Sequence, residues 1–311
     1  METQQAHSRQ TYSLTGRDAV PPWRDPRTAQ RAVPTRTHLV WLNLVCLDAP
    51  LVALAWLYLF ARTFHVRLDL GNCAILFLTA WMIYLADRLA DAVALSSQTS
   101  RSLRGEFCLR YRRPWSWTLG AIAALDAALI WRSTDARTFF AGALVGIAAL
   151  TYLVLNYSLG RIWSFLPLKE VAIGFLFTAG TLVGLLPDIP PIDSGFVFSA
   201  LAFAMICTLN CVSIAAWERE LDVAQKKISI ATRYPSVRGH LGKIALALVL
   251  AAFLGAMFCP QAVLIFGCAS VSALLLALLD FVGEAIDQDQ RTALADLVLL
   301  TPLVALIGAS V

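Results

Sequence analysis

Long apolar segments are the feature that most constrains how this chain folds. The sequence holds nine of them, each about 20 residues long, which is the length of a helix that crosses a bilayer. Only 15% of the residues are charged and 58% are hydrophobic, whereas a soluble domain carries about 25% charged residues. The sequence therefore predicts an all-α polytopic membrane protein with nine transmembrane helices. The predicted spans are residues 39–61, 70–95, 115–131, 137–157, 168–187, 195–217, 241–258, 260–279 and 292–310.

The remaining boundaries follow from polar and turn-forming residues. Residues 1–37 hold six arginines and four prolines and predict a disordered cytoplasmic tail ahead of a transmembrane domain over 38–311. This tail does not resemble a secretory signal peptide. The segment Cys259-Pro260-Gln261 predicts a short turn between the seventh and eighth spans.

The distribution of basic residues predicts the orientation of the chain. With nine spans, 21 of the 25 lysines and arginines fall on one side of the membrane and 4 on the other. Because basic loops remain in the cytoplasm, we expect the N-terminus inside and the C-terminus outside.

Two pairs of carboxylates mark the candidate functional site. Asp87 and Asp91 end the second predicted span, and Glu218 and Asp222 follow the sixth. Residues four apart share one face of a helix, and an even number of crossings places both pairs on the cytoplasmic side. Carboxylates of this kind suit Mg²⁺, which binds one or two of them together with substrate phosphates. The alternative is that each pair merely ends its helix and pairs with a neighbouring arginine.

Several further polar residues are candidates for substrate binding. Lys169, at the start of the fifth span, and Lys226, one turn past the second acidic pair, are placed to contact phosphate oxygens. Ordinary positive-inside charge is the competing explanation for Lys226. Asp48 lies within the first span and needs a partner or a cavity. Asn210 would line a pocket or form an interhelical hydrogen bond.

Aromatic and small residues have structural explanations beside functional ones. Tyr84, next to the first acidic pair, would wall an apolar tunnel or serve as an interfacial anchor. Two glycine pairs, Gly142 with Gly146 and Gly180 with Gly184, have the spacing of closely packed membrane helices. We expect close helix contacts at these four glycines.

Taken together, these segments resemble the UbiA superfamily of intramembrane prenyltransferases over roughly residues 40–310. Asp87-Arg88-Leu89-Ala90-Asp91 matches the second half of the family's Asn-Asp-x-x-Asp-x-x-x-Asp motif, although Ile83 and Tyr84 stand where the family has Asn and Asp. Glu218, Glu220 and Asp222 are similar to its second acidic motif. Leu47-Asp48-Ala49-Pro50 is similar to the family's Leu-Asp-Lys/Arg-Pro, and Lys169 to its phosphate-binding basic residue.

The resemblance implies a fold and an activity. It implies a UbiA-like bundle that transfers a polyprenyl group from a prenyl diphosphate to a small acceptor, such as an aromatic compound or quinone precursor, within the bacterial inner membrane. The implied reaction involves no nucleic acid. Mg²⁺ would be held by Asp87, Asp91, Glu218 and Asp222. Substrate would be bound by Lys169, Asp48, Arg88, Tyr84, Asn210, Glu220 and Lys226.

Two other functions remain open at this point. One is a terpene cyclase of the same superfamily, which needs no acceptor. The other is a non-enzymatic membrane protein, either a transporter or a family member that has lost activity. Transport predicts ionisable residues near the midplane on several helices, whereas both acidic pairs are predicted to lie at one membrane face.

Overall fold

The structure is a computed structural model that describes residues 38–94, 102–158, 169–186 and 193–308. Every regular element in these ranges is a helix, which confirms the all-α prediction. The predicted tail, residues 1–37, lies outside the described residues. The helices are α1 (His38–Leu44), α2 (Asp48–Thr63), α3 (Leu70–Ala94), α4 (Leu103–Arg110), α5 (Arg112–Ser133), α6 (Ala136–Ser158), α8 (Lys169–Leu182), α9 (Ser194–Trp217), α10 (Arg219–Ala224), α11 (Ile230–Arg233), α12 (Leu241–Phe258), α13 (Val263–Phe281), α14 (Gln288–Leu297) and α15 (Thr301–Gly308).

Six helical segments in this part of the chain are long and apolar enough to cross a membrane. They are Leu70–Ala94, Ala136–Asn156, Ser194–Trp217, Pro235–Phe258, Pro260–Phe281 and Gln288–Gly308. These segments indicate an integral membrane protein. The other three predicted spans are also helical, but the first is divided into α1 and α2, the third (α5) carries Asp126 in its middle, and α8 has only 14 residues.

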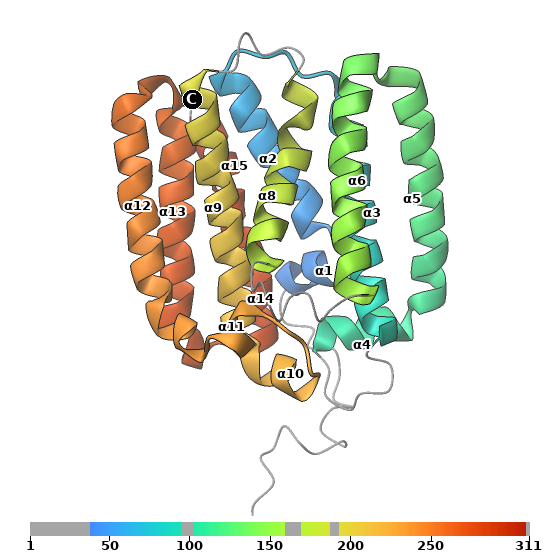
Figure 1. The fold of residues 1–311 in the computed structure, drawn as a ribbon, viewed down its shortest axis with the longest axis vertical. Helices are drawn as coiled ribbons and strands as arrows, with labels where there is room; N and C mark the ends of the chain where they lie inside the picture. Colours follow the sequence, from blue (N-terminus) through green and yellow to red (C-terminus); the bar gives the residue numbers. More distant parts are fainter. Residues whose placement is uncertain (1–37, 95–101, 159–168, 187–192, 309–311) are drawn as a thin grey trace, which may run out of the picture. The chain divides into compact units, whose positions relative to one another are not determined.

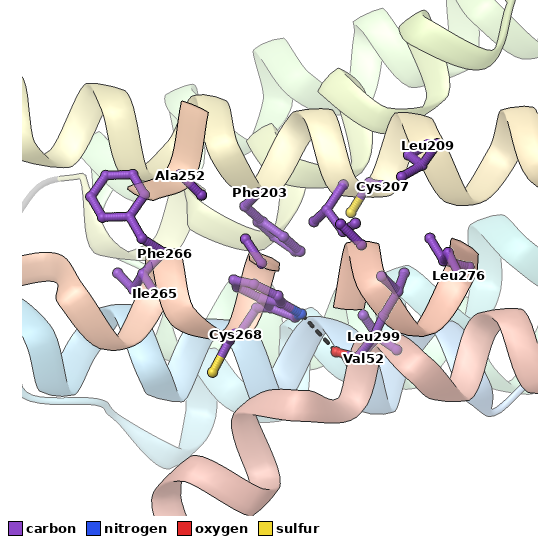
Figure 2. Close-up of a cluster of buried hydrophobic side chains, with 14 of the residues drawn as sticks. Val52, Phe203, Cys207, Leu209, Ala252, Ile265, Phe266, Cys268, Leu276 and Leu299 are labelled. Carbon is purple, nitrogen blue, oxygen red and sulfur yellow. Dashed lines mark hydrogen bonds between the residues drawn. The ribbon is translucent and has the colours of Figure 1, made fainter. Parts of the chain in front are cut away.

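Helix α9 lies at the centre of the helices in residues 39–311. It packs against α8, α12, α13 and α14, and more than half of its membrane window is buried (Figure 1). Its sequence is apolar on every side, as expected of a helix surrounded by others. The ring of Phe203 on α9 stacks on Trp56 of α2 with centroids 4.3 Å apart. Figure 2 shows Phe203 within the buried cluster that joins α9 to α13 and the last span.

The outward faces of α5, α6 and α12 are strongly apolar. Trp131 on α5 is 90% exposed and Phe140 on α6 is 70% exposed, and α12 exposes Phe253 and Met257. In water, apolar faces this continuous would cause the protein to associate or aggregate. Lipid tails are the solvent that these faces require.

Prolines explain why two predicted spans are interrupted. Pro50 lies in the first turn of α2, and the chain before it leaves the helix at Cys46, which has a φ of +59°. Pro302 similarly begins α15 and has no N–H to donate to the carbonyl four residues earlier, that of Val298. Ser272 of α13 donates to this carbonyl at 2.9 Å instead. Side chains from neighbouring helices thus replace the missing backbone hydrogen bond, as an apolar environment demands.

The tight helix contact is not where the sequence pattern predicts it. A Cβ added at Gly142, Gly146 or Gly184 would meet nothing within 4 Å, so the prediction of close contacts at the two glycine pairs is wrong. The close contact is at Gly174 on α8. A Cβ there would lie 2.7 Å from the backbone nitrogen of Thr208 and 2.8 Å from the carbonyl oxygen of Ala204, both on α9.

Gly174→Ala should therefore force α8 away from α9 and lower the free energy of unfolding by about 1–3 kcal/mol. Gly180→Ala is the matched control on the same helix, because its nearest neighbour would be Val145 at an ordinary 3.8 Å. Thermal unfolding of the detergent-purified variants, followed by tryptophan fluorescence, measures both. Equal midpoints for the two variants would show that α8 and α9 are not packed this closely.

Candidate functional site

A pocket lined by charged side chains lies where α3, α4, α10 and the end of α9 meet. We call it the charged pocket. Three carboxylates face it from two segments far apart in the sequence, and three cations accompany them. Its lining residues are Arg88, Asp91, Ala92, Ser102, Arg104, Gly105, Cys108, Glu218, Leu221, Asp222, Gln225 and Lys227. The structure therefore brings one member of the first acidic pair together with both members of the second.

Local helix chemistry places the residues from α3 and α4. Arg88 and Asp91 are three residues apart on α3 and so share one face. Ser102 caps α4 by accepting a hydrogen bond from the backbone N–H of Gly105 at 3.3 Å. This cap fixes the first turn of α4 and directs Arg104 toward the end of α9.

The end of α9 is anchored from both sides beside the pocket. The indole N–H of Trp217 donates to Asp280 of α13 at 2.8 Å. The guanidinium of Arg291 on α14 lies 4.6 Å from the Trp217 ring centroid, a cation–π contact. Trp217 is thereby fixed, and the next residue, Glu218, is held where α9 ends and α10 begins.

Glu218 makes the strongest ion pair of the site. One Nη of Arg104 donates to both carboxylate oxygens at 2.7 and 2.6 Å. The hydroxyl of Thr292 on α14 donates to the same carboxylate at 3.1 Å. Both members of the ion pair have side chains that are only 11% exposed, so this is a desolvated pair that links α4, α9 and α14.

Asp91 is paired with Lys227, the neighbour of Lys226, which the sequence singles out for phosphate contact. The two atoms Lys227 Nζ and Asp91 Oδ2 are 2.6 Å apart. Helix α10 ends in a left-handed residue, Lys226, with a φ of +56°. The N–H of Lys226 bonds to the carbonyl of Val223, and that of Lys227 to the carbonyl of Asp222. This is the Schellman pattern, in which glycine usually occupies the left-handed position. The turn exposes Lys226 and returns Lys227 to the pocket.

Asp222 is the carboxyl group of the pocket that has no strong cationic contact of its own. Burial raises its pKa to about 6, and the nearby charge of Glu218 acts in the same direction. A hydrogen bond with Ser229 and the charges of Lys227 and Lys169 oppose this rise. Asp222 is thus held in its charged form at neutral pH at some cost to stability.

The remaining predicted site residues do not line the charged pocket. Asp87 lies one turn before Asp91, and Glu220 is exposed on α10. Lys169 begins α8 within electrostatic range of Asp222. Tyr84 accepts a hydrogen bond from Arg88 at 2.6 Å, and its ring lies beneath the guanidinium.

Asp48 and Asn210 belong to a second polar cluster. With Asn43 and Asp296 they form a set of hydrogen-bonded side chains between α1, α2, α9 and α14. Asp48 is 1% exposed and Asn210 is 5% exposed. Both are therefore buried side chains with partners, and neither faces the charged pocket.

The carboxylates partly fit the Mg²⁺ ion that the UbiA resemblance implies. Asp91, Glu218 and Asp222 offer the oxygen ligands that Mg²⁺ prefers. Among the described residues, however, no three His, Cys, Asp or Glu side chains are arranged so that they could hold a metal ion by themselves. The set fits an ion shared with a phosphate ligand, for which one or two carboxylates suffice, and it does not fit a cage made by protein alone.

The sequence analysis did not place Arg104 or Lys227 among the candidate site residues. Arg104 lies in a loop whose basic residues are explained by orientation alone. The signal that was present is the sequence Ser102-Leu103-Arg104-Gly105-Glu106, in which a helix-capping serine precedes the arginine. A short helix at the membrane surface would have placed Arg104 beside the acidic residues.

Comparison with known proteins gives no template for this pocket. No protein-family model, no curated protein and no solved structure matches the chain. The resemblance to the UbiA superfamily therefore rests on the quoted residues. Their placement in the structure is independent of that resemblance.

Arg104→Met should lower the free energy of unfolding by about 3 kcal/mol, because it leaves the buried charge of Glu218 without its cation. The double variant Arg104→Met with Glu218→Gln should recover most of this loss, since no unpaired charge remains. Thermal unfolding in detergent measures both, with Arg110→Met on the exposed face of α4 as control. A double variant as unstable as the single one would contradict a paired, desolvated Glu218.

Asp222→Asn should become more stable than the wild type as the pH rises. The folded pKa of about 6 exceeds the ordinary 3.8, so the favourable contribution of the Asp222 carboxyl is complete below about pH 3.8 and is lost as the pH rises through 6. Between pH 4.5 and 7.5 the advantage of the variant should grow by about 1 kcal/mol after allowance for solvent screening.

Asp135→Asn provides a control of opposite sign for this measurement. Asp135 lies in the turn before α6, where hydrogen bonds from Thr138 lower its pKa. This variant should lose stability relative to the wild type as the pH rises toward 3.8, the ordinary pKa of aspartate, and should show no further trend above about pH 4.5. Unfolding midpoints measured across the pH range, with the same trend in both variants, would refute the assignment for Asp222.

Proposed function

We propose that this protein binds the diphosphate group of a polyprenyl diphosphate in the charged pocket and transfers the prenyl group to a small acceptor within the membrane. The observation that carries the proposal is the meeting of Asp91, Glu218 and Asp222 with three cations in one pocket. Phosphate oxygens are recognised by arginine and lysine. Carboxylates beside them are the ligands of a Mg²⁺ ion shared with the phosphates.

Binding requires the ion pairs of the pocket to separate. The cavity within it measures about 40 Å³, which is room for a few water molecules and not for a diphosphate. The cations already present, Arg104 and Lys227, neutralise Glu218 and Asp91. An entering diphosphate offers these cations a more highly charged partner. Their transfer to phosphate oxygens would open the pocket and release the two carboxylates.

The residues then have separate roles in the transfer reaction. Arg88, Arg104 and Lys227 bind the diphosphate and stabilise the charge that develops on it as the leaving group. Lys169 adds to this positive field from the start of α8. Asp91, Glu218 and Asp222 would hold Mg²⁺, which when bound neutralises the diphosphate as a Lewis acid. The prenyl chain extends into apolar surroundings that exclude water from the allylic cation.

The acceptor belongs to the class of aromatic compounds or quinone precursors. Tyr84, which lies beneath Arg88, is an aromatic ring close to the pocket that can stabilise a cation. A terpene cyclase would use the same pocket without an acceptor.

We also propose the topology that this reaction needs. All nine predicted spans cross the membrane, with the N-terminus in the cytoplasm and the C-terminus outside. The support for this is the division of 21 basic residues against 4, and helices in all nine predicted ranges. The charged pocket then faces the cytoplasm, the aqueous side on which the diphosphate group of a prenyl diphosphate would lie.

A transporter is the second candidate function. The observation in its favour is Asp296 in the last predicted span, hydrogen-bonded to Asn43 and Asn210 inside the bundle. Ionisable side chains on several membrane helices are typical of transport pathways. Prenyl diphosphate binding separates the two candidates, because a cation-coupled transporter has no need of it.

Purified protein should bind geranylgeranyl diphosphate in the presence of Mg²⁺ and lose affinity at least about tenfold in Lys227→Met, which removes a phosphate ligand. Lys226→Met is the matched control, since this neighbouring lysine is exposed and outside the pocket. Asp222→Asn should abolish the dependence on Mg²⁺, while Asp135→Asn should leave it unchanged. Isothermal titration in detergent measures all four.

Two results would count against the proposal. Folded wild-type protein that binds no prenyl diphosphate of any chain length would eliminate it. Equal losses in Lys227→Met and Lys226→Met would show that binding, if present, is a diffuse surface effect and not a property of the charged pocket.

A further inference from the structure

The two interrupted spans meet at a set of four polar side chains, which we call the polar quartet: Asn43, Asp48, Asn210 and Asp296. Asn43 lies in the last turn of α1 and Asp48 begins α2, on either side of the first interruption. Asp296 lies in the last turn of α14, just before the second interruption. Asn210 comes from the continuous helix α9.

The quartet is a connected network. Asn43 Nδ2 donates to Asp48 Oδ2 at 2.6 Å and to Asp296 Oδ2 at 3.0 Å. Asn210 Nδ2 donates to Asp296 Oδ1 at 2.9 Å. The carboxyl groups of Asp48 and Asp296 are also hydrogen-bonded to each other. Two carboxyl groups can share such a bond only when one of them carries a proton.

The interruptions of the helices do not explain this network. The carbonyl of Val298 is satisfied by Ser272, and that of Leu299 by the indole N–H of Trp56 at 2.8 Å. The carbonyl of Asn43 accepts from the backbone N–H of Cys46. Groups outside the quartet therefore satisfy these three carbonyls. Asp48 Oδ1 accepts from the backbone N–H of Ala49 at 2.9 Å in the first turn of α2, but no such backbone contact accounts for the carboxyl group of Asp296.

One oxygen of the quartet lacks a partner. Oδ1 of Asn210 accepts no hydrogen bond, although the side chain is 95% buried (5% exposed). The nitrogen of the same amide donates to Asp296. Buried acceptors are nearly always satisfied. This oxygen can accept from a donor or coordinate a cation, and the neighbouring Asp296 is only partly buried.

The charges around the quartet point to a cation. Arg88 lies within electrostatic range of Asp296. It donates a hydrogen bond to Tyr84, which lies within electrostatic range of both carboxyl groups. Two carboxylates opposite one guanidinium leave a single negative charge. The C-terminal ends of α1 and α14, which bear partial negative charge, also meet here. The C-terminal ends of interrupted membrane helices are typical sites for Na⁺ or H⁺.

We propose that the polar quartet binds one monovalent metal cation of the sodium class. The ligands are the carboxyl oxygens of Asp48 and Asp296 and the free amide oxygen of Asn210. Rotation of the Asn43 amide by half a turn presents its oxygen as a fourth ligand, an exchange of O and N that leaves the shape of the side chain unchanged. The ion supplies the single positive charge that the shared proton supplies otherwise.

This site is separate from the charged pocket. Of the quartet, no member lines that pocket, and the test requires no prenyl diphosphate. The proposed prenyl transfer and the proposed cation site can therefore fail independently of each other.

The test uses the full chain purified in detergent. Exchange of choline chloride for NaCl at constant ionic strength should raise the thermal midpoint in a saturating manner, by about 5 °C when Na⁺ reaches about 100 times its Kd. Choline is too large to enter the quartet. Direct retention of ²²Na⁺ by the wild-type protein should give one ion per chain.

Variants locate the site. Asp296→Asn should abolish the Na⁺-dependent rise, because it removes a charge while keeping the side-chain shape. Asp126→Asn is the matched control: Asp126 is 2% exposed on α5 and hydrogen-bonded to Thr79, away from the quartet. Asn210→Leu, which removes an oxygen without changing charge, should weaken Na⁺ binding at least tenfold and serves if Asp296→Asn does not fold.

Wild-type protein with the same midpoint in NaCl and in choline chloride, and with no bound ²²Na⁺, would overturn the proposal. So would a Na⁺-dependent rise of equal size in the wild type, Asp296→Asn and Asn210→Leu, because the ion would then bind elsewhere.

Discussion

Charge that is carried into an apolar bundle must be neutralised close by, and the polar features of this protein follow from that constraint. The pair of Arg104 and Glu218 illustrates it: the carboxylate ends a membrane helix, and a separate short helix, α4, supplies its cation. Lys227 does the same for Asp91 from the turn after α10. Each neutralising residue comes from a different segment, so the ion pairs also hold the ends of these helices together.

The same constraint keeps the charged pocket small. Its cations and carboxylates satisfy one another and leave a cavity of only about 40 Å³. Removing the partner of a buried charge is costly, whereas substituting another partner of the same charge costs much less. The proposed ligand would have to bring both charges with it. A diphosphate together with a divalent cation is such a ligand.

In the polar quartet, side-chain amides rather than cations are the partners of the buried carboxyl groups. Asn43 and Asn210 donate to Asp48 and Asp296 where the two proline-interrupted spans meet. Arg88 belongs to both regions, since it lines the charged pocket and lies within electrostatic range of Asp296. Helix α3 thus carries the one side chain common to the site of the proposed reaction and the proposed cation site.

Sequence patterns predicted local features well and contacts between helices poorly. The turn at Pro260 is confirmed by a 3-10 turn that begins there. Spacing cannot tell which lysine of a pair faces inward, and the left-handed residue Lys226 reversed the expected choice. The tight glycine is Gly174, which belongs to neither glycine pair, because closeness depends on the neighbouring helix and not on spacing along one helix.

The sequence by itself determined that the chain is helical and belongs in a membrane, because apolar length and the need to satisfy the backbone in lipid leave few other solutions. It also identified the acidic residues that end two spans, since charge is rare there. Only the tertiary structure decided that Asp91, Glu218 and Asp222 share a pocket, that Arg104 and Lys227 neutralise it, and that Asp48 meets Asp296. The two ion pairs join residues 114 and 136 positions apart, and the position of one helix against another is set by packing that no local pattern records.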